Sequence, residues 1–218
     1  MFTHFITIKN SQRNFWLFVI LFFVIWMLRT LLYGYFAPNL TNDWIRSLVS
    51  DLSKLLLWVL PVWGYLRYIE RVDALAFLKL NRPNRTTLIA CTLIILLGIS
   101  WEIILRRFGL NRSEQTDLRY VISAVLSTSF LEEILFRGFI LNQIRRFRSW
   151  PSAIMITSIL FVLIHVPGWA IIQGLTFTAI LRLAFDIFFV PTLILGWLVK
   201  RTDSLYPSIL LHMINNWV

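Results

Sequence analysis

Two adjacent carboxylates, Glu132 and Glu133, lie within the apolar run LEEILFR at residues 131–137. Glu133 and Arg137 are four residues apart, in the order that favours an ion pair on one face of a helix. Glu132 points about 100° away from that pair on the same helix. We therefore predict that Arg137 neutralises Glu133 and that Glu132 finds its partner on another segment. A cluster that only fixes helix packing would explain Glu133 and Arg137, but not Glu132.

Two histidines in other apolar segments are the candidate partners of Glu132. They occur in the patterns Phe161-x-x-x-His165 and His212-x-x-x-Asn216. A spacing of four places each pair on one face of a helix. A histidine alone in such a segment is as often a packing residue as a site. Two histidines, a spare glutamate and an asparagine together favour convergence on a polar cavity.

This set of groups suits hydrolysis. A carboxylate can take a proton from water, and an imidazole can orient the same water molecule. A second imidazole and an amide N–H can donate to the oxyanion that develops on a scissile carbonyl. We expect no cofactor; zinc held by Glu132, His165 and His212 is the alternative, since three protein ligands would leave an open position. The sequence contains no His-Glu-x-x-His motif, no Gly-x-Ser-x-Gly elbow and no Gly-rich phosphate loop.

The composition predicts that these groups lie inside a membrane. Of 218 residues, 58% are apolar and only 15% are charged, whereas a soluble protein has about 25% charged residues. Cys91 is the only cysteine, which excludes a disulfide-stabilised secreted scaffold. We predict an all-α fold: a polytopic transmembrane bundle of seven to eight helices that forms a single membrane-embedded domain, residues 1–218.

The predicted spans follow from the apolar segments, because a bilayer core needs roughly 20 helical residues. They are Phe15–Phe36, Ile45–Arg67, Thr86–Leu105, Leu118–Asn142, Ser152–Val166, Ile171–Val199 and Ser204–Val218. An eighth is expected if Trp169–Arg182 forms a separate short helix, and a kink is expected at Pro191. The N-terminal spans thus cover about residues 15–105, and the motif-bearing core about residues 118–218. The first span is expected to be a signal anchor, since it is longer than the apolar part of a cleaved signal peptide.

Basic residues outnumber acidic ones, 21 to 11, and most lie between the apolar segments. The positive-inside rule then predicts a cytoplasmic N-terminus in a multi-pass protein of the cell inner (plasma) membrane. We expect the partners to be the lipid bilayer and a peptide or protein substrate, not nucleic acid. Lys54 and Glu102 lie near predicted span ends, where their side chains are expected to reach water. Arg29 has no local partner in the sequence.

The three motifs resemble those of the CPBP family, also called the Abi family, which contains CAAX prenyl endopeptidases and bacteriocin-processing or immunity proteins. They are Glu-Glu-x-x-x-Arg at 132–137, Phe-x-x-x-His at 161–165 and His-x-x-x-Asn at 212–216. The stretch from Leu195 to His212 also resembles the approach to the third motif in this family. The resemblance covers about Val121–Val218, and the N-terminal spans match only in being hydrophobic.

The resemblance implies an intramembrane endopeptidase of about eight helices, with a cavity open to one side of the membrane. By this analogy Glu132 is the general base and His165 holds the catalytic water. His212 and Asn216 would form the oxyanion site, and Phe161, Glu133 and Arg137 would support the motif segments. The similarity to the Ras-converting members favours a glutamate mechanism without metal. Only two residues follow Asn216 in the sequence, so we expect the oxyanion role to weaken first if this end frays.

Two other functions stay open at this point. The leading prediction is a glutamate-dependent peptidase that acts on a membrane-associated peptide, prenylated or carrying a leader. The alternative is a non-catalytic bacteriocin-immunity protein, or a regulator of membrane signalling, that uses the same fold as a scaffold. A transporter is the third reading, since intramembrane His and Glu also mark proton relays.

Overall fold

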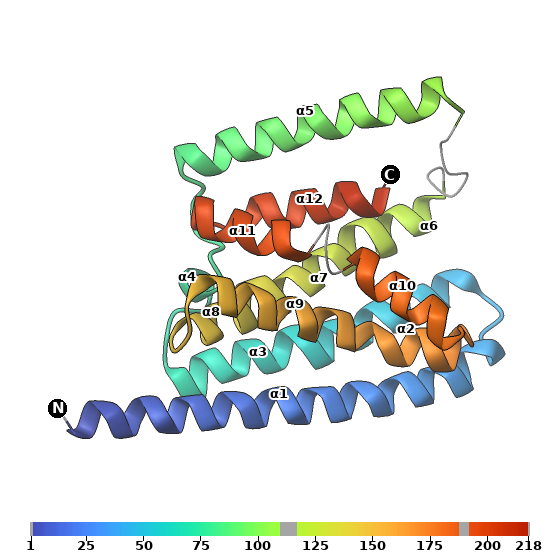
Figure 1. Ribbon diagram of the computed structural model, residues 1–218. Helices are drawn as coiled ribbons and strands as arrows, with labels where there is room; N and C mark the ends of the chain where they lie inside the picture. Colours follow the sequence, from blue (N-terminus) through green and yellow to red (C-terminus); the bar gives the residue numbers. More distant parts are fainter. Residues whose placement is uncertain (1, 110–116, 188–191, 218) are drawn as a thin grey trace.

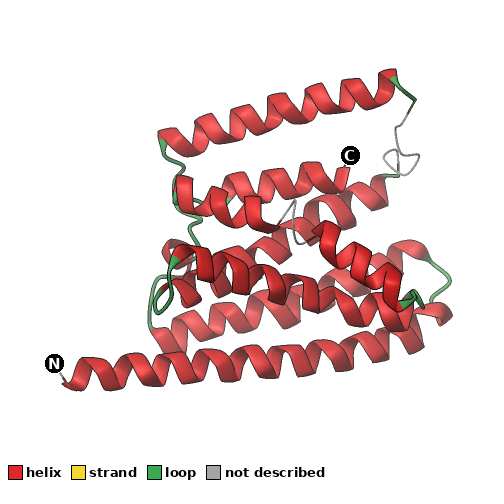
Figure 2. Cartoon of the chain, in the orientation of Figure 1, coloured by secondary structure: helices red, strands yellow, loops and turns green. Residues whose placement is uncertain are grey.

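The computed structural model describes residues 2–109, 117–187 and 192–217, with side chains from residue 11 onward. Within these ranges every regular element is a helix (Figure 2), which confirms the predicted all-α class. Pro191 and the kink predicted there lie outside the described residues.

The N-terminal part begins with α1, Phe2–Phe36, which runs along one edge of the bundle (Figure 1). A short 3-10 turn, Ala37–Asn39, follows it. The next elements are α2 (Asp43–Lys54) and α3 (Leu60–Gly64), which are joined by a π-helical turn, Leu55–Val59. A second π-helical turn, Tyr65–Glu70, follows α3. Together they form one continuous helix, which we call the 43–70 helix. Asn42 begins it, because its side chain accepts hydrogen bonds from the backbone N–H groups of Trp44 and Ile45.

A single turn, α4 (Ala74–Phe77), leads to α5 (Arg85–Arg107) at the opposite edge of the bundle (Figure 1). The next long helix consists of α6 (Leu118–Tyr120), a π-helical segment Val121–Thr128, α7 (Ser129–Glu133), a second π-helical segment Ile134–Ile140, and α8 (Leu141–Arg145). We call this continuous helix the motif helix.

The last helices are α9 (Trp150–Pro167) with a π-helical extension Gly168–Ile172, α10 (Phe177–Ile187), α11 (Leu193–Thr202) and α12 (Tyr206–Trp217). Trp169 therefore belongs to the end of α9, and the separate short helix predicted over residues 169–182 begins instead at Phe177. α9 ends at Pro167, but the π-helical turn Gly168–Ile172 continues the helix past this proline.

The motif helix occupies the centre of the bundle, and every residue from Leu131 to Leu141 is buried. The 43–70 helix, α9, α11 and α12 pack directly against it. α1 covers α9 and the 43–70 helix from one side, and α5 covers α12 from the other (Figure 1). The central position explains why this segment carries no clear amphipathic pattern, since it has no face to expose.

Three helices in the described ranges are long and apolar enough to cross a membrane: Ser11–Asn39, Arg85–Arg107 and Trp150–Ile172. The motif helix has the length to do so, but it carries charged residues in its middle. α11 and α12 contain 10 and 12 residues, which at 1.5 Å per residue is shorter than the roughly 30 Å of a hydrocarbon core. α11 packs against the longer α9, and α12 packs against the longer α5.

Candidate active site

Two neighbouring faces of the motif helix carry its polar side chains. Ser129, Glu133 and Arg137 share one face, and Thr128 and Glu132 share the other. Arg137 Nη1 donates to Glu133 Oε1 at 2.9 Å, which confirms the predicted ion pair. Both side chains are fully buried, with 1% and 0% exposure. π-helical segments flank both ends of α7, a distortion that is frequent at functional sites.

Glu133 is the centre of a hydrogen-bond network between the motif helix and α12. Besides the bond from Arg137, it accepts hydrogen bonds from Ser208 Oγ and from His212 Nδ1, the latter at 2.9 Å. A buried carboxylate is stable only when its charge is compensated in this way. Sequence reasoning missed Ser208, although Ser208, His212 and Asn216 are spaced four apart on one helix face.

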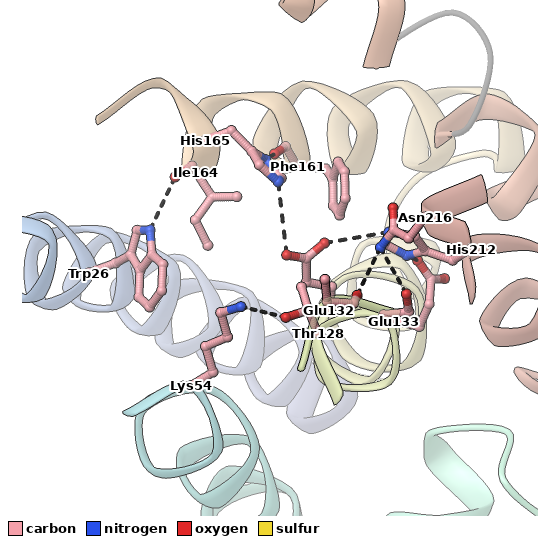
Figure 3. A network of polar contacts seen from close by, with 12 residues as sticks. Trp26, Lys54, Thr128, Glu132, Glu133, Phe161, Ile164, His165, His212 and Asn216 are labelled. Atoms are coloured by element: carbon pink, nitrogen blue, oxygen red, sulfur yellow. Dashed lines mark hydrogen bonds and ion pairs between the residues drawn. The ribbon is translucent and has the colours of Figure 1, made fainter. Parts of the chain in front are cut away.

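The neighbouring carboxylate of Glu132 lies between the two histidines (Figure 3). Its Oε1 is 3.9 Å from Nε2 of His165 on α9, and its Oε2 is 3.7 Å from Nε2 of His212 on α12. These separations are too long for direct hydrogen bonds and short enough for one bridging water molecule. The structure therefore brings Glu132, His165 and His212 together from three helices.

Backbone and side-chain acceptors fix the orientation of both imidazoles. His165 Nδ1 lies 2.7 Å from the carbonyl oxygen of Phe161, and His212 Nδ1 lies against the Glu133 carboxylate. Both partners accept hydrogen bonds, so each Nδ1 carries the proton. In the neutral ring, Nε2 then presents its lone pair toward Glu132.

Phe161 holds this arrangement together by ring contacts. The Arg137 guanidinium lies over its ring at 4.2 Å, and the rings of His165 and His212 lie 4.9 and 5.9 Å from it. Only 3% of Phe161 is exposed. The aromatic residue of the second motif thus contacts charged or imidazole groups of all three motifs.

Asn216 contacts the motif helix and not the Glu132 carboxylate. Its amide nitrogen donates to the Ala124 carbonyl at 3.2 Å and to Ser129 Oγ at 3.0 Å. Both amide hydrogens are used in these bonds. In this structure the predicted oxyanion donor therefore fixes α12 against the motif helix.

Lys54, which the sequence predicted to reach water near the end of a span, contacts the motif helix close to Glu132. Its Nζ donates to Thr128 Oγ1 at 2.6 Å, one turn before Glu132 on the motif helix. The 43–70 helix directs Lys54 toward the motif helix, where Thr128 accepts this hydrogen bond, and the Lys54 side chain stays partly exposed. Arg29, for which the sequence offered no local partner, donates to Ser53 and Ser50.

The helix that carries His165 is anchored to α1. Trp26 Nε1 donates to the carbonyl of Ile164 at 3.1 Å. This carbonyl is available because the N–H of Gly168 binds the His165 carbonyl instead. The break in the regular helix pattern after His165 thus provides the acceptor for α1.

The zinc alternative depends on three side chains, Glu132, His165 and His212. In the part of the chain that the structure describes, no group of three or more His, Cys, Asp or Glu side chains is arranged to hold a metal ion. The Glu132 carboxylate oxygens lie 3.9 Å and 3.7 Å from the Nε2 atoms of His165 and His212.

The fold and this site define a class: helical membrane proteins with a carboxylate and two imidazoles gathered at the centre of the bundle. Residues 114–218 match the Rce1-like family model, described as type II CAAX prenyl endopeptidase Rce1-like. The matched region contains all three motifs, so the resemblance to the CAAX-type family is confirmed for this part of the chain. The description of that family names an endopeptidase, an enzyme that hydrolyses peptide bonds. No curated protein and no solved structure matches the chain.

Proposed function

We propose that this chain is an intramembrane endopeptidase in which Glu132 activates the hydrolytic water without a metal ion. The observation that carries the proposal is the 3.9 Å separation between Glu132 Oε1 and His165 Nε2, with His165 Nδ1 fixed as a donor to Phe161. Both facing atoms are hydrogen-bond acceptors. A water molecule between them would donate one hydrogen to each and direct an oxygen lone pair away from both.

The proposed reaction uses this water as the nucleophile. Its oxygen attacks the scissile carbonyl carbon while its proton passes to Glu132. When His212 carries a second proton, its Nε2–H donates to the resulting oxyanion. Collapse of this intermediate breaks the C–N bond, and the proton on Glu132 passes to the leaving amine. The carboxylate is then ready for the next water molecule.

The fixed charges around the site support this role. Glu133 and Arg137 form a neutral pair that needs no rearrangement during the reaction. Glu133 also holds the His212 ring, so its Nε2 stays directed toward Glu132. Asn216 would contribute to the oxyanion site only by exchanging one of its bonds to the motif helix for a bond to the substrate. We therefore assign its main role to positioning α12.

We infer that the substrate is a membrane-associated peptide or protein tail, prenylated or carrying a leader. The apolar outer surfaces of α1 and α5 place the protein in a membrane. The distribution of basic residues favours the plasma membrane with a cytoplasmic N-terminus. A substrate already tethered to the bilayer would reach the central site without leaving the membrane.

The test compares two glutamate variants in reconstituted vesicles with quenched prenylated and leader-type peptides. Glu132→Gln should lower kcat by about 10²–10⁴-fold, because the amide cannot take the proton of water. Glu102→Gln is the matched control: this glutamate also lies in an apolar helix, but it pairs with Arg106 far from the histidines. Cleavage by Glu132→Gln at the rate of the control would overturn the peptidase mechanism.

A further inference from the structure

A row of polar contacts runs between the 43–70 helix and the motif helix, and we call it the polar seam. It consists of three contacts: Arg119 Nη1 to Ser47 Oγ at 3.4 Å, Ser123 Oγ to Asp51 Oδ1 at 3.0 Å, and Lys54 Nζ to Thr128 Oγ1 at 2.6 Å. Each contact joins one residue of each helix. Successive contacts are about one helical turn apart, so the seam is continuous along both helices.

The seam leads from the end of the bundle to Glu132. It starts near the exposed N-terminus of the 43–70 helix, which lies at the end of α1 opposite the N-terminus of the chain (Figure 1). From Ser47 to Lys54 it advances by about 10 Å at 1.5 Å per residue. Its last member, Thr128, is four residues before Glu132 on the same face of the motif helix (Figure 3).

The seam residues are half-buried, whereas Glu132 is only 5% exposed. Polar groups at membrane depth are costly in contact with acyl chains and are tolerated where they line water. Asp51 and Lys54 are charged, and they lie on apolar segments that the sequence places within a span. Their partial exposure therefore points to contact with water.

The hydrogen bonds of Lys54 also indicate that the seam contacts water. An ammonium group has three donors, and the described residues provide one hydrogen-bond acceptor for it, Thr128. Its ammonium also lies 5.9 Å from the ring of Trp58 and interacts electrostatically with the carboxylates of Glu132 and Asp51. Polar side chains that only join two helices would use up their donors on each other. Lys54 retains donors for water molecules beside Glu132.

Further charged groups keep the seam polar along its length. Arg29 on α1 donates to Ser50 and Ser53 of the 43–70 helix, beside Asp51. Asp117 pairs with Arg119 at 2.8 Å where the seam begins. Charges of both signs thus line the route without a large net charge that would trap an ion.

We propose that the polar seam is the route by which water reaches Glu132, from the membrane face opposite the N-terminus. The proposal rests on the proposed function, because each hydrolysed peptide bond consumes one water molecule at a carboxylate enclosed by the bundle. The seam delivers water from one side, while the substrate approaches from the lipid.

Single-cysteine labelling tests the seam without any measurement of activity. Cys91, the only native cysteine, is first replaced by Ser, and Ser123→Cys or Ile122→Cys is then introduced. The two positions are adjacent and at the same depth, but Ile122 is 44% exposed on the apolar outer face. Sealed vesicles are treated with a membrane-impermeant thiosulfonate reagent from either face. Such reagents need the thiolate, which forms only in contact with water.

Ser123→Cys should react at least about tenfold faster than Ile122→Cys, and only from the face opposite the N-terminus. Equal rates at the two positions, or reaction only from the N-terminal face, would overturn the seam. The labelling result is independent of Glu132, whereas the Glu132→Gln measurement tests the peptidase alone. The two proposals can therefore fail separately.

A kinetic experiment adds a second readout. Ser123→Val replaces the hydroxyl that binds Asp51 with a small apolar side chain, at a position that does not contact the histidines. It should lower kcat and leave KM unchanged, because water delivery is slowed while the substrate contacts stay intact. Ser100→Val on α5 is the control, since its hydroxyl binds only the Leu96 carbonyl. An unchanged kcat for Ser123→Val would count against the seam as the water route.

Discussion

His212 Nδ1 lies 2.9 Å from Glu133 Oε1, although 79 residues separate them in the chain. This contact determines which nitrogen of His212 faces Glu132. It also gives the two adjacent glutamates different roles. Glu133 is hydrogen-bonded to fixed partners and holds His212 in place, while Glu132 lies between the imidazoles of His165 and His212.

Phe161 is expected to act as a positioning residue for both histidines. Phe161→Leu removes the ring that contacts Arg137, His165 and His212. We predict a fall in kcat/KM of roughly tenfold to a hundredfold, since small misplacements of catalytic groups have effects of this size. Leu163→Ala, at an exposed position on the same helix, is the control and should retain activity. Equal activity of the two variants would show that the ring does not position the histidines.

The buried ion pair of the motif helix should be far more important for stability than an exposed pair with the same spacing. Arg137→Met leaves Glu133 buried without its cation, and we predict a loss of about 3–5 kcal/mol in the free energy of unfolding. Arg106→Met breaks the Glu102–Arg106 pair on α5, where the arginine is 60% exposed, and should cost about 0–1 kcal/mol. Denaturation in detergent measures both. Similar losses would contradict the central role of the buried pair.

Asn216 and Ser129 are predicted to act together. Asn216→Ala removes two hydrogen bonds to the motif helix, and Ser129→Ala removes one of them. If Asn216 positions α12, Ser129→Ala should cause part of the loss in stability and in kcat that Asn216→Ala causes. Each lost hydrogen bond should lower the free energy of unfolding by about 1 kcal/mol. Full activity of Ser129→Ala beside an inactive Asn216→Ala would instead assign Asn216 to direct contact with the oxyanion.

Glu70, at the end of the 43–70 helix, should make stability depend on pH. Burial raises the pKa of its carboxyl, but hydrogen bonds from Arg146 and Ser11 outweigh this, so the pKa lies below its ordinary value. A lowered pKa gives stability that is complete above the pKa of the unfolded chain, about 4.3, and that is lost as the pH falls through the folded value.

We therefore predict that Glu70→Gln melts at a lower temperature than the wild type at pH 7, and that the difference shrinks between pH 5 and pH 3. Tryptophan fluorescence during heating measures this. Ser11→Ala, which removes one of the donors, should show a smaller difference with the same sign. A difference that is constant over this pH range would contradict the assignment.

Removal of metal ions is predicted to leave cleavage unchanged. The wild-type protein would be assayed before and after treatment with a strong chelator, and the active fraction analysed for bound metal. The expected result follows from the proposed mechanism, in which Glu132 and His165, 3.9 Å apart, hold the water molecule without a metal ion. Loss of activity that added zinc restores would contradict the glutamate mechanism.

The sequence by itself determined the class of fold and named the three motifs whose side chains meet at the site. The low charged fraction leaves no soluble fold available, and a spacing of four predicted the Glu133–Arg137 pair from helix geometry alone. Glu132 was also recognisable, because a carboxylate without a local partner in an apolar helix needs one elsewhere. These conclusions depend on composition and on contacts within a single helix.

Only the tertiary structure decided how the helices meet. The bond from Ser208 to Glu133, the use of both Asn216 hydrogens and the inward direction of Lys54 depend on the rotation of each helix about its axis. That rotation is set by packing between helices, which periodicity cannot reveal in segments that are apolar on all sides. The polar seam also depends on how the helices pack, since its contacts join residues 72 to 74 positions apart in the sequence.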